Sequence, residues 1–217
     1  MTPTSRDHPS FSAVILAGGY ATRFGEDDKA VADLAGKPMI RRVVERLSVS
    51  VDTIVVNCRA EQQSPIESAL ESLSGDPTVT IEFAFDPVPD QGPVGGIKTG
   101  LEAVSNEYAA VVACDMPFCS PALLEELAAR AAGHNGAVVR LEDGWYQPTH
   151  AVYRAQPMAT ACSAVLESDD KRIVRALEAI DCIVVEESDL ETPVGTAFES
   201  IDTKEALLEA ERRLTSE

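Results

Sequence analysis

Short apolar runs rich in Val and Ile alternate along the chain with amphipathic helical patterns, and this alternation restricts the fold more than any other feature. Several runs are apolar at every position, which is typical of strands buried on both faces. The runs predict strands over residues 11–17, 53–57, 79–85, 109–113, 137–141 and 182–185. Apolar spacings of i, i+3 and i+4 predict helices over 39–47, 64–73, 96–104, 121–131, 172–180 and 204–214. Strands that alternate with helices imply an α/β fold, in which a mostly parallel sheet carries helices on both faces.

One domain accounts for the whole pattern. A chain of 217 residues has the length of a single α/β domain, and the sequence contains neither a repeat nor a low-complexity linker. We expect a disordered N-terminal extension over residues 1–10 and a folded domain over residues 11–217. Near the end of the chain, Asp202 or Thr203 is expected to cap the last helix.

Charge and hydropathy restrict the partners and the location of the protein. The 36 Asp and Glu against 18 Lys and Arg give a formal net charge of -18, so nucleic acid and anionic membranes are not expected partners. The acidic residues are spread along the chain, which fits a halophilic source such as a halophilic archaeon, and also fits an ordinary acidic enzyme. No apolar run approaches the ~20 residues that cross a bilayer, and the first ten residues lack a signal-peptide pattern. We therefore expect a cytoplasmic protein.

A glycine-rich segment with two cations follows the first predicted strand. Gly18 and Gly19 permit a tight backbone turn and leave peptide N–H groups free to face an anion. Arg23 and Lys29 add side-chain cations to the same segment. An open α/β sheet binds ligands at the carboxyl ends of its strands, where this segment begins. The segment lacks the patterns of a Walker loop and of a dinucleotide fold, so we expect an anion-binding loop of another type, with a solvated turn as the alternative.

The same residues carry a resemblance to a known family. The motif Leu-Ala-Gly-Gly at 16–19, with Arg23, Gly25 and Lys29 after it, resembles the opening of the nucleotide-diphospho-sugar transferase fold. Within that fold the chain is most similar to the molybdenum cofactor guanylyltransferases, the MobA-like group. Further matching segments follow in the family's order at 28–29, 34–38, 55–57, 86, 91–97, 113–118, 147–153 and 202–206.

The resemblance implies a fold and an activity. The fold would be a single-domain, Rossmann-like, three-layer α/β/α nucleotide-diphospho-sugar transferase fold. The activity would be Mg²⁺-dependent transfer of GMP from GTP to the phosphate of molybdopterin, with release of pyrophosphate, and transient contact with molybdoenzymes or other cofactor-biosynthesis proteins is implied as well. Alternatives are cytidylyl transfer to molybdopterin, guanylyl transfer in another cofactor pathway, sugar-1-phosphate activation, and a carrier without catalysis.

The resemblance also implies residues that bind the nucleotide. The backbone of Leu16, Ala17, Gly18 and Gly19 would meet the guanine base and the phosphates. Asn57 and Asp86 would help to select and hold the base. Gly92 and Gly95 would let a loop over residues 92–96 approach the ligand closely. As alternatives, Asn57 and Asp86 would be turn residues, and the glycines would only shape the loop before a helix.

Catalysis is expected from two cations and one carboxylate. The resemblance implies that Arg23 and Lys29 neutralise the triphosphate and that Asp115 binds Mg²⁺. The sequence makes this reasonable, because Asp115 follows an apolar strand and offers the hard oxygen ligand that Mg²⁺ prefers. The alternative for Asp115 is a loop or cap carboxylate.

Two positions depart from the family pattern. Gln147 stands where the family commonly has His, so a polar contact at that position is open. Asp202 stands where the family more often has Asn, and it would either join the metal site or cap the last helix. Trp145 and His150 lie near Gln147 and would either border the acceptor pocket or serve the structure.

Overall fold

The computed structural model describes residues 9–19, 28–71 and 79–216 of the chain. The expected N-terminal extension over residues 1–10 falls largely outside this range, and so does Arg23. No helix in the described ranges has both the length and the apolar character needed to span a membrane.

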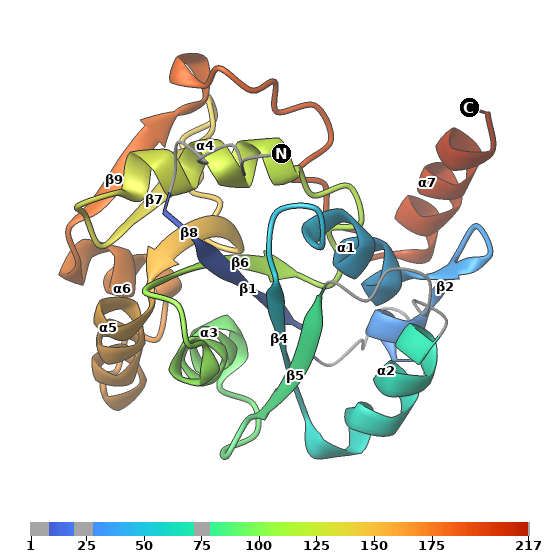
Figure 1. The fold of residues 1–217 in the computed structure, drawn as a ribbon, viewed down its shortest axis with the longest axis horizontal. Coiled ribbons are helices and arrows are strands. Elements are labelled where there is room, and N and C mark those ends of the chain that lie inside the picture. The colour runs from blue at the N-terminus through green and yellow to red at the C-terminus, as the bar shows by residue number, and fades with distance from the viewer. Residues whose placement is uncertain (1–8, 20–27, 72–78, 217) are drawn as a thin grey trace, which may run out of the picture.

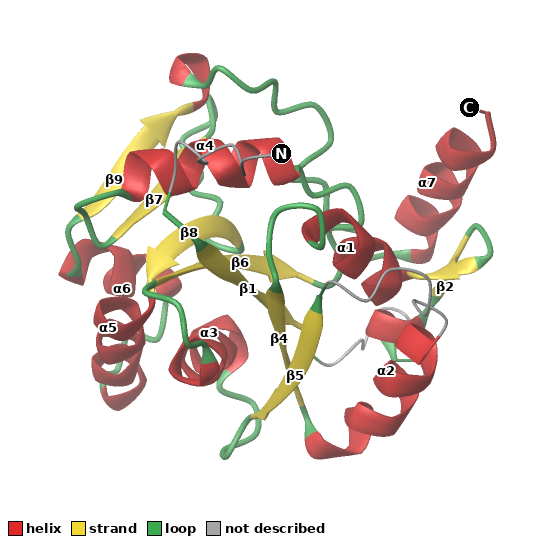
Figure 2. Cartoon of the chain, viewed as in Figure 1, coloured by secondary structure: helices red, strands yellow, loops and turns green. Residues whose placement is uncertain are grey.

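A seven-stranded sheet forms the centre of the described structure, with strand order β5-β4-β1-β6-β8-β7-β9 (Figures 1 and 2). Its strands are β1 (Phe11–Leu16), β4 (Thr53–Cys58), β5 (Thr80–Phe85), β6 (Tyr108–Ala113), β7 (Gly136–Arg140), β8 (His150–Arg154) and β9 (Cys182–Glu186). Neighbouring strands are parallel except on the two sides of β8, which runs antiparallel to β6 and β7. The prediction of a mostly parallel sheet is confirmed.

Helices cover both faces of this sheet. The helices are α1 (Met39–Leu47), α2 (Gln63–Leu70), α3 (Gly92–Ala103), α4 (Pro121–Ala131), α5 (Ala155–Glu167), α6 (Ile173–Ala179) and α7 (Lys204–Ser216). Successive side chains of a strand point to opposite faces. Ala13 and Ile15 of β1 accordingly pack with α1, α2 and α4, whereas Val14 packs with α3 and α5. The three-layer α/β/α arrangement is confirmed, with α3, α5 and α6 together on one side of the sheet in Figure 1.

Short elements and a third apolar cluster connect α7 to the rest of the molecule. The 3₁₀ turns are η1 (Lys29–Val31), η2 (Ala60–Gln62) and η4 (Glu187–Asp189), and a small hairpin consists of β2 (Asp33–Leu34) and β3 (Lys37–Pro38). Leu34 of this hairpin, Ile201 and Ala210 of α7 are buried together. In the described structure the C-terminal helix therefore packs on the hairpin and on Met39 at the start of α1.

The predicted elements agree with the structure in type. Residues 72–73 of the predicted second helix lie outside the described ranges. β8, α5 and the β2–β3 hairpin were not predicted. The expected loop over residues 92–96 is wrong, because these residues form the first turns of α3. Pro93 is compatible with this position, since the first turn of a helix has no partner for the N–H that proline lacks.

The register of the sheet brings three strand ends level with one another. Leu16 at the end of β1 pairs with Asn57 of β4 on one side and with Ala113 of β6 on the other. The ladder continues one step further, because the Ala17 N–H donates to Asn57 O over 2.8 Å and the Cys114 N–H donates to Leu16 O over 3.0 Å. The segments that follow these strands consequently start from one edge of the sheet.

Candidate functional site

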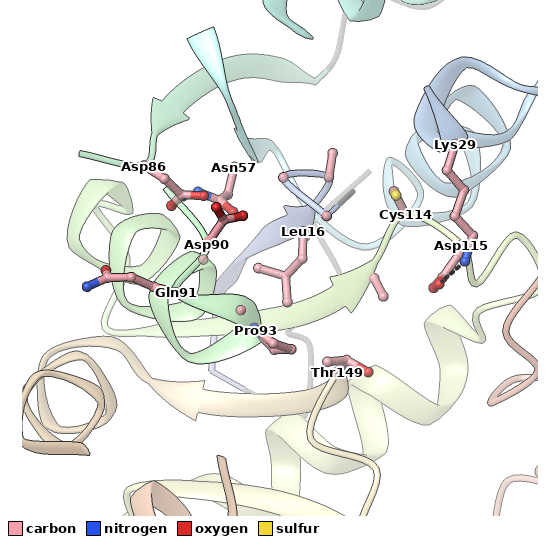
Figure 3. Close-up of a pocket in the computed structure, with 16 residues that line it drawn as sticks. Leu16, Lys29, Asn57, Asp86, Asp90, Gln91, Pro93, Cys114, Asp115 and Thr149 are labelled. Atoms are coloured by element: carbon pink, nitrogen blue, oxygen red, sulfur yellow. Dashed lines mark hydrogen bonds and ion pairs between the residues drawn. The ribbon is translucent and has the colours of Figure 1, made fainter. Parts of the chain in front are cut away.

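A cavity of about 410 Å³ lies at this edge of the sheet. Figure 3 shows Leu16 near its middle, with Asn57, Asp86 and Asp90 to one side and Lys29 and Asp115 to the other. The lining residues among those described are Leu16, Ala17, Gly18, Gly19, Lys29, Asn57, Asp86, Asp90, Gln91, Gly92, Pro93, Gly96, Ala113, Cys114, Asp115 and Thr149. Segments far apart in the sequence thus share one concave site, as is typical of small-molecule sites.

Asn57 and Asp86 form a hydrogen-bonded pair on one side of the cavity. The Asn57 Nδ2–H donates to Asp86 Oδ1 over 2.7 Å and to Ala84 O over 3.3 Å. Asn57 is 1% exposed, so its amide is held in one orientation. The second carboxylate oxygen, Asp86 Oδ2, is not used by Asn57 and faces the glycine turn.

The turn at Gly18 and Gly19 requires a glycine at position 18 but not at position 19. A Cβ at Gly18 would stand 2.9 Å from Asp86 Oδ2, closer than real Cβ contacts come. At Gly19 no heavy atom of the described chain would lie within 4 Å of such a Cβ, so this side of the turn is open to the cavity. An alanine at position 18 would therefore displace Asp86.

Lys29 lies between two carboxylates on the opposite side of the cavity. Its Nζ is 2.6 Å from Asp115 Oδ2 and 3.5 Å from Asp202 Oδ1. Asp115 follows β6, whereas Asp202 precedes α7, and a backbone hydrogen bond from the Ile201 N–H to Asp115 O joins the two segments over 2.8 Å. The cap of α7 is Thr203, whose Oγ1 accepts from the Ala206 N–H over 3.1 Å. Asp202 therefore faces Lys29.

The Asp115 carboxylate has the features of a cation ligand. Its Oδ1 is buried and accepts no hydrogen bond from any described residue. A buried oxygen of this kind is costly unless a ligand or an ion satisfies it. The described residues contain no group of three or more His, Cys, Asp or Glu able to hold a metal. The donor set, one or two carboxylates beside an open cavity, is the kind that Mg²⁺ accepts when phosphate oxygens and water complete its shell.

The start of α3 borders the cavity. Gly92, which has a φ of +63°, and Gly96 both line it. A Cβ at Gly96 would lie 2.5 Å from Asn57 Oδ1, so a side chain there would disturb the Asn57–Asp86 pair. Gly95 is directed against Gln91, whose Cβ would be 2.5 Å from a Cβ at position 95. The structure therefore assigns Gly95 a packing contact within the helix and not a place on the cavity wall.

The candidate residues around the β7–β8 connection, Trp145, Gln147 and His150, differ from one another in burial and in their contacts. His150 is fully buried, its Nε2 accepts from the Ser120 N–H over 3.2 Å, and its ring packs edge-on against Phe198. Burial lowers the pKa of His150 to about 4, so the ring is neutral at pH 7. Trp145 is 73% exposed, and the Gln147 N–H pairs with Val139 O. Of the two readings left open for His150, the structure supports the structural one.

Five cavity residues were not singled out from the sequence: Asp90, Gln91, Ala113, Cys114 and Thr149. Four of them stand in matching segments, Gln91 in 91–97, Ala113 and Cys114 in 113–118, and Thr149 in 147–153. Asp90 has a φ of +61°, which is uncommon for a residue other than glycine, and no pattern in the sequence indicates it.

Comparisons with known proteins give a consistent result. The pattern of the MobA-like NTP transferase domain matches residues 13–183. The probable molybdenum cofactor guanylyltransferase of Natronomonas pharaonis is 51% identical over 205 residues, which cover 94% of this chain and 98% of that one. The protein of the same name from Haloferax mediterranei is 32% identical over 193 residues, covering 88% and 89%.

A solved structure also has a similar fold. The molybdopterin-guanine dinucleotide biosynthesis protein A from Archaeoglobus fulgidus superposes with a TM-score of 0.74 at 26% identity. The superposition covers 95% of this chain and 100% of that chain. The similarity therefore extends over both faces of the sheet.

Proposed function

The chain belongs to the MobA-like NTP transferase family, and from this premise we propose that it is a molybdenum cofactor guanylyltransferase. It transfers GMP from GTP to the phosphate of molybdopterin, releases pyrophosphate and yields the guanine dinucleotide form of the cofactor. The names of the relatives in Natronomonas pharaonis and Haloferax mediterranei support this acceptor and this base.

One observation carries the proposal: the glycine turn, the Asn57–Asp86 pair and the Lys29–Asp115 pair line one cavity. A nucleoside triphosphate has a flat base with hydrogen-bonding edges and a polyanionic tail. In the cavity, the amide of Asn57 and the carboxylate of Asp86 lie on one side of Leu16, and the cation of Lys29 lies on the other (Figure 3). The first pair suits the base, and the cation suits the polyanionic tail. We propose that the base binds near Asp86 and that the phosphates bind near Lys29.

Guanine selection would depend on the free oxygen of Asp86. Guanine presents two adjacent donors, N1–H and the N2 amino group, whereas cytosine presents one donor, the N4 amino group, beside two acceptors, N3 and O2. A carboxylate oxygen accepts and cannot donate, so it favours the donor edge. Because Asn57 holds Asp86 Oδ1 over 2.7 Å, Asp86 Oδ2 is the oxygen that would face the base.

The chemistry requires positioning and charge neutralisation. A phosphate oxygen of molybdopterin forms a bond to the α-phosphorus of GTP while the bond from that phosphorus to the pyrophosphate oxygen breaks, and pyrophosphate leaves. A phosphate monoester is already a nucleophile near pH 7, so no covalent enzyme intermediate is needed. Lys29 would neutralise charge on the phosphates, and the peptide N–H groups of the glycine turn would hold them in place. Arg23, outside the described residues, would add a second cation.

Magnesium dependence is part of this proposal. Lys29 with Asp115 and Asp202 makes a group of one positive and two negative charges, which by itself repels a triphosphate. Asp115, through the Oδ1 that accepts no hydrogen bond from the described residues, and Asp202 would hold Mg²⁺. When bound, the ion would supply positive charge beside the phosphates and reverse the sign of this end of the cavity.

The setting of the enzyme is proposed from the sequence. A cytoplasmic location fits an enzyme that uses GTP, and a product destined for other enzymes fits transient contact with molybdoenzymes. The net charge of -18 fits a halophilic source, because high salt screens repulsion among the acidic residues.

Pyrophosphate release tests the function. The protein is incubated with molybdopterin, Mg²⁺ and either GTP or CTP, and pyrophosphate is measured with and without EDTA. We expect release with GTP only, and none after EDTA. Release with CTP alone would assign the cytidylyl alternative, and nucleotide binding without release in any combination would assign a carrier.

A further inference from the structure

The Gln62 side chain is a buried amide beside the cavity, and both its nitrogen and its oxygen have hydrogen-bond partners. It ends η2, between β4 and α2, and is 2% exposed. Its Nε2 group donates to Ala17 O over 2.9 Å and to Asp28 Oδ2 over 2.7 Å, and its Oε1 accepts from the Arg59 N–H over 2.9 Å. Ala17 and Asp28 lie on the two sides of residues 20–27, so one amide joins both described ends of that segment.

Asp28 extends this connection to Lys29. While its Oδ2 accepts from Gln62, its Oδ1 accepts from the Ala30 N–H over 3.0 Å and caps η1. η1 begins with Lys29, whose Nζ reaches Asp115. A continuous series of hydrogen bonds thus runs from Gln62 through Asp28 to the backbone that carries Lys29.

Arg59 orients the glycine turn from the same side. Its guanidinium donates to Gly18 O over 2.8 Å and to Gly19 O over 3.4 Å. In a trans peptide the C=O and the following N–H point in opposite directions. With Gly18 O held on Arg59, the Gly19 N–H points away from Arg59, toward the side on which Gly18 and Gly19 line the cavity.

We propose that Gln62 is a positioning residue for the nucleotidyl transfer and acts together with Arg59. Within the described structure neither side chain lines the cavity, so their effect on the reaction is exerted through Lys29 and the glycine N–H groups. Gln62 fixes the start of the turn at Ala17 and the cap of η1 at Asp28, which sets the distance between these phosphate-binding groups. The proposal rests on the proposed function for its catalytic consequence.

Position 62 requires a side chain that donates a hydrogen bond. A glutamate at position 62 would place a carboxylate against Asp28 Oδ2 and Ala17 O, both acceptors. An asparagine at position 28 would again provide a donor for that carboxylate while its own carbonyl could still accept from the Ala30 N–H. Exchange of donor and acceptor between the two positions therefore restores their contact.

The test compares Gln62→Glu, Asp28→Asn and the double variant in the pyrophosphate assay. We expect Gln62→Glu to lower kcat/KM for GTP by about tenfold or more, the effect of one lost hydrogen bond to a charged group. The double variant should recover part of this loss, because the contact with position 28 returns while Ala17 O still lacks its donor. Gln63→Glu is the matched control and should keep wild-type kcat/KM, because the Gln63 side chain donates to the exposed Glu67 Oε1 over 2.7 Å, away from Ala17 and Asp28. Gln62→Met, which removes the amide without adding charge, replaces Gln62→Glu if that variant does not fold, and should show the same loss.

A second measurement separates this proposal from the proposed function. In the nucleotide-free protein, Gln62→Glu or Gln62→Met should speed hydrogen exchange of the Ala30 N–H by about tenfold, while amides of β6 stay at wild-type rates. This result supports the connection even if the wild type releases no pyrophosphate, an outcome that would refute only the function. Unchanged Ala30 exchange, or a double variant no more active than Gln62→Glu, would overturn the positioning role.

Discussion

Substitution of Gly96 by alanine should damage nucleotide binding more than it damages stability. A Cβ at Gly96 would stand 2.5 Å from Asn57 Oδ1 and 3.3 Å from Leu16 Cδ2. Ordinary contact begins at 3.4 Å, so the Asn57 amide has to withdraw by about 0.9 Å. Asn57 is fully enclosed, and this shift breaks its 2.7 Å hydrogen bond to Asp86.

The two energetic effects on folding oppose one another. Overpacking of a tight interior costs about 1–3 kcal/mol. Gly96 lies within α3, and alanine stabilises a helix interior by about 0.5–1 kcal/mol relative to glycine. We expect a net loss of about 1 kcal/mol in the free energy of unfolding. Loss of one hydrogen bond to a charged group, worth about 1.5–3 kcal/mol, would raise the dissociation constant for GTP by about 10- to 100-fold.

Gly100→Ala is the matched control for this prediction. Gly100 lies one helical turn further along α3, and a Cβ there would overlap Val14 Cγ1 in the core. Urea unfolding should give both variants a similar loss of stability, whereas equilibrium binding of GTP should be weakened in Gly96→Ala only. Wild-type affinity in Gly96→Ala, or an equal loss in Gly100→Ala, would refute the idea that Asn57 and Asp86 position the base.

Three further predictions concern charge. Lys29→Ala should lower the rate of pyrophosphate release by about 100-fold or more, because it removes a cation from the phosphate site, while circular dichroism shows an intact fold; normal turnover would exclude Lys29 from the mechanism. His150 binds a proton below about pH 6.5 when unfolded but only below about pH 4 when folded, so stability is present at neutral pH and is lost as pH falls from 6.5 to 4. Between pH 7.5 and 5.5 this loss amounts to about 1.4 kcal/mol. The free energy of unfolding of His150→Gln should therefore fall by about 1.4 kcal/mol less over this range than that of the wild type. If the two proteins lost stability in parallel as the pH fell, a neutral buried ring would be contradicted. Raising KCl from about 0.1 M to about 1 M shortens the Debye length from about 10 Å to about 3 Å and should raise the melting temperature of a chain of net charge -18, whereas an unchanged value would argue against surface repulsion.

The sequence could predict the sheet because its strands are defined locally. The runs that become β1, β4 and β6 are apolar and β-branched, and burial on both faces requires that composition. α5 was not predicted because it consists largely of the small residues Ala, Thr, Ser and Cys, with Pro157 near its start, so few large apolar side chains mark its buried face. The first turn of α3 escaped because Gly-Pro-Val-Gly-Gly has low helix propensity. Close packing of Gly96 on Asn57 requires small residues there, which is a tertiary reason that no local pattern contains.

The site residues also divide into those that a local pattern predicts and those that depend on tertiary packing. The glycine turn, Lys29 and Asp115 could be predicted, since each follows a strand end or stands in a matching segment. The contact of Asp202 with Lys29 spans 173 positions, and its place before a helix suggested a cap. The actual cap is Thr203, and the hydrogen bond of the Ile201 N–H to Asp115 O places the neighbouring Asp202 beside Lys29.

The hydrogen bond between Ile201 and Asp115 joins the C-terminal segment to the charges around Lys29. The match to the family model ends at residue 183, and Asp202 and α7 follow it in the chain. One carboxylate of the charged group therefore belongs to a tail that packs on the β2–β3 hairpin and leaves both sheet faces untouched. A substitution of the half-exposed Asp202 can therefore alter the charge around Lys29 without touching the residues buried on either face of the sheet.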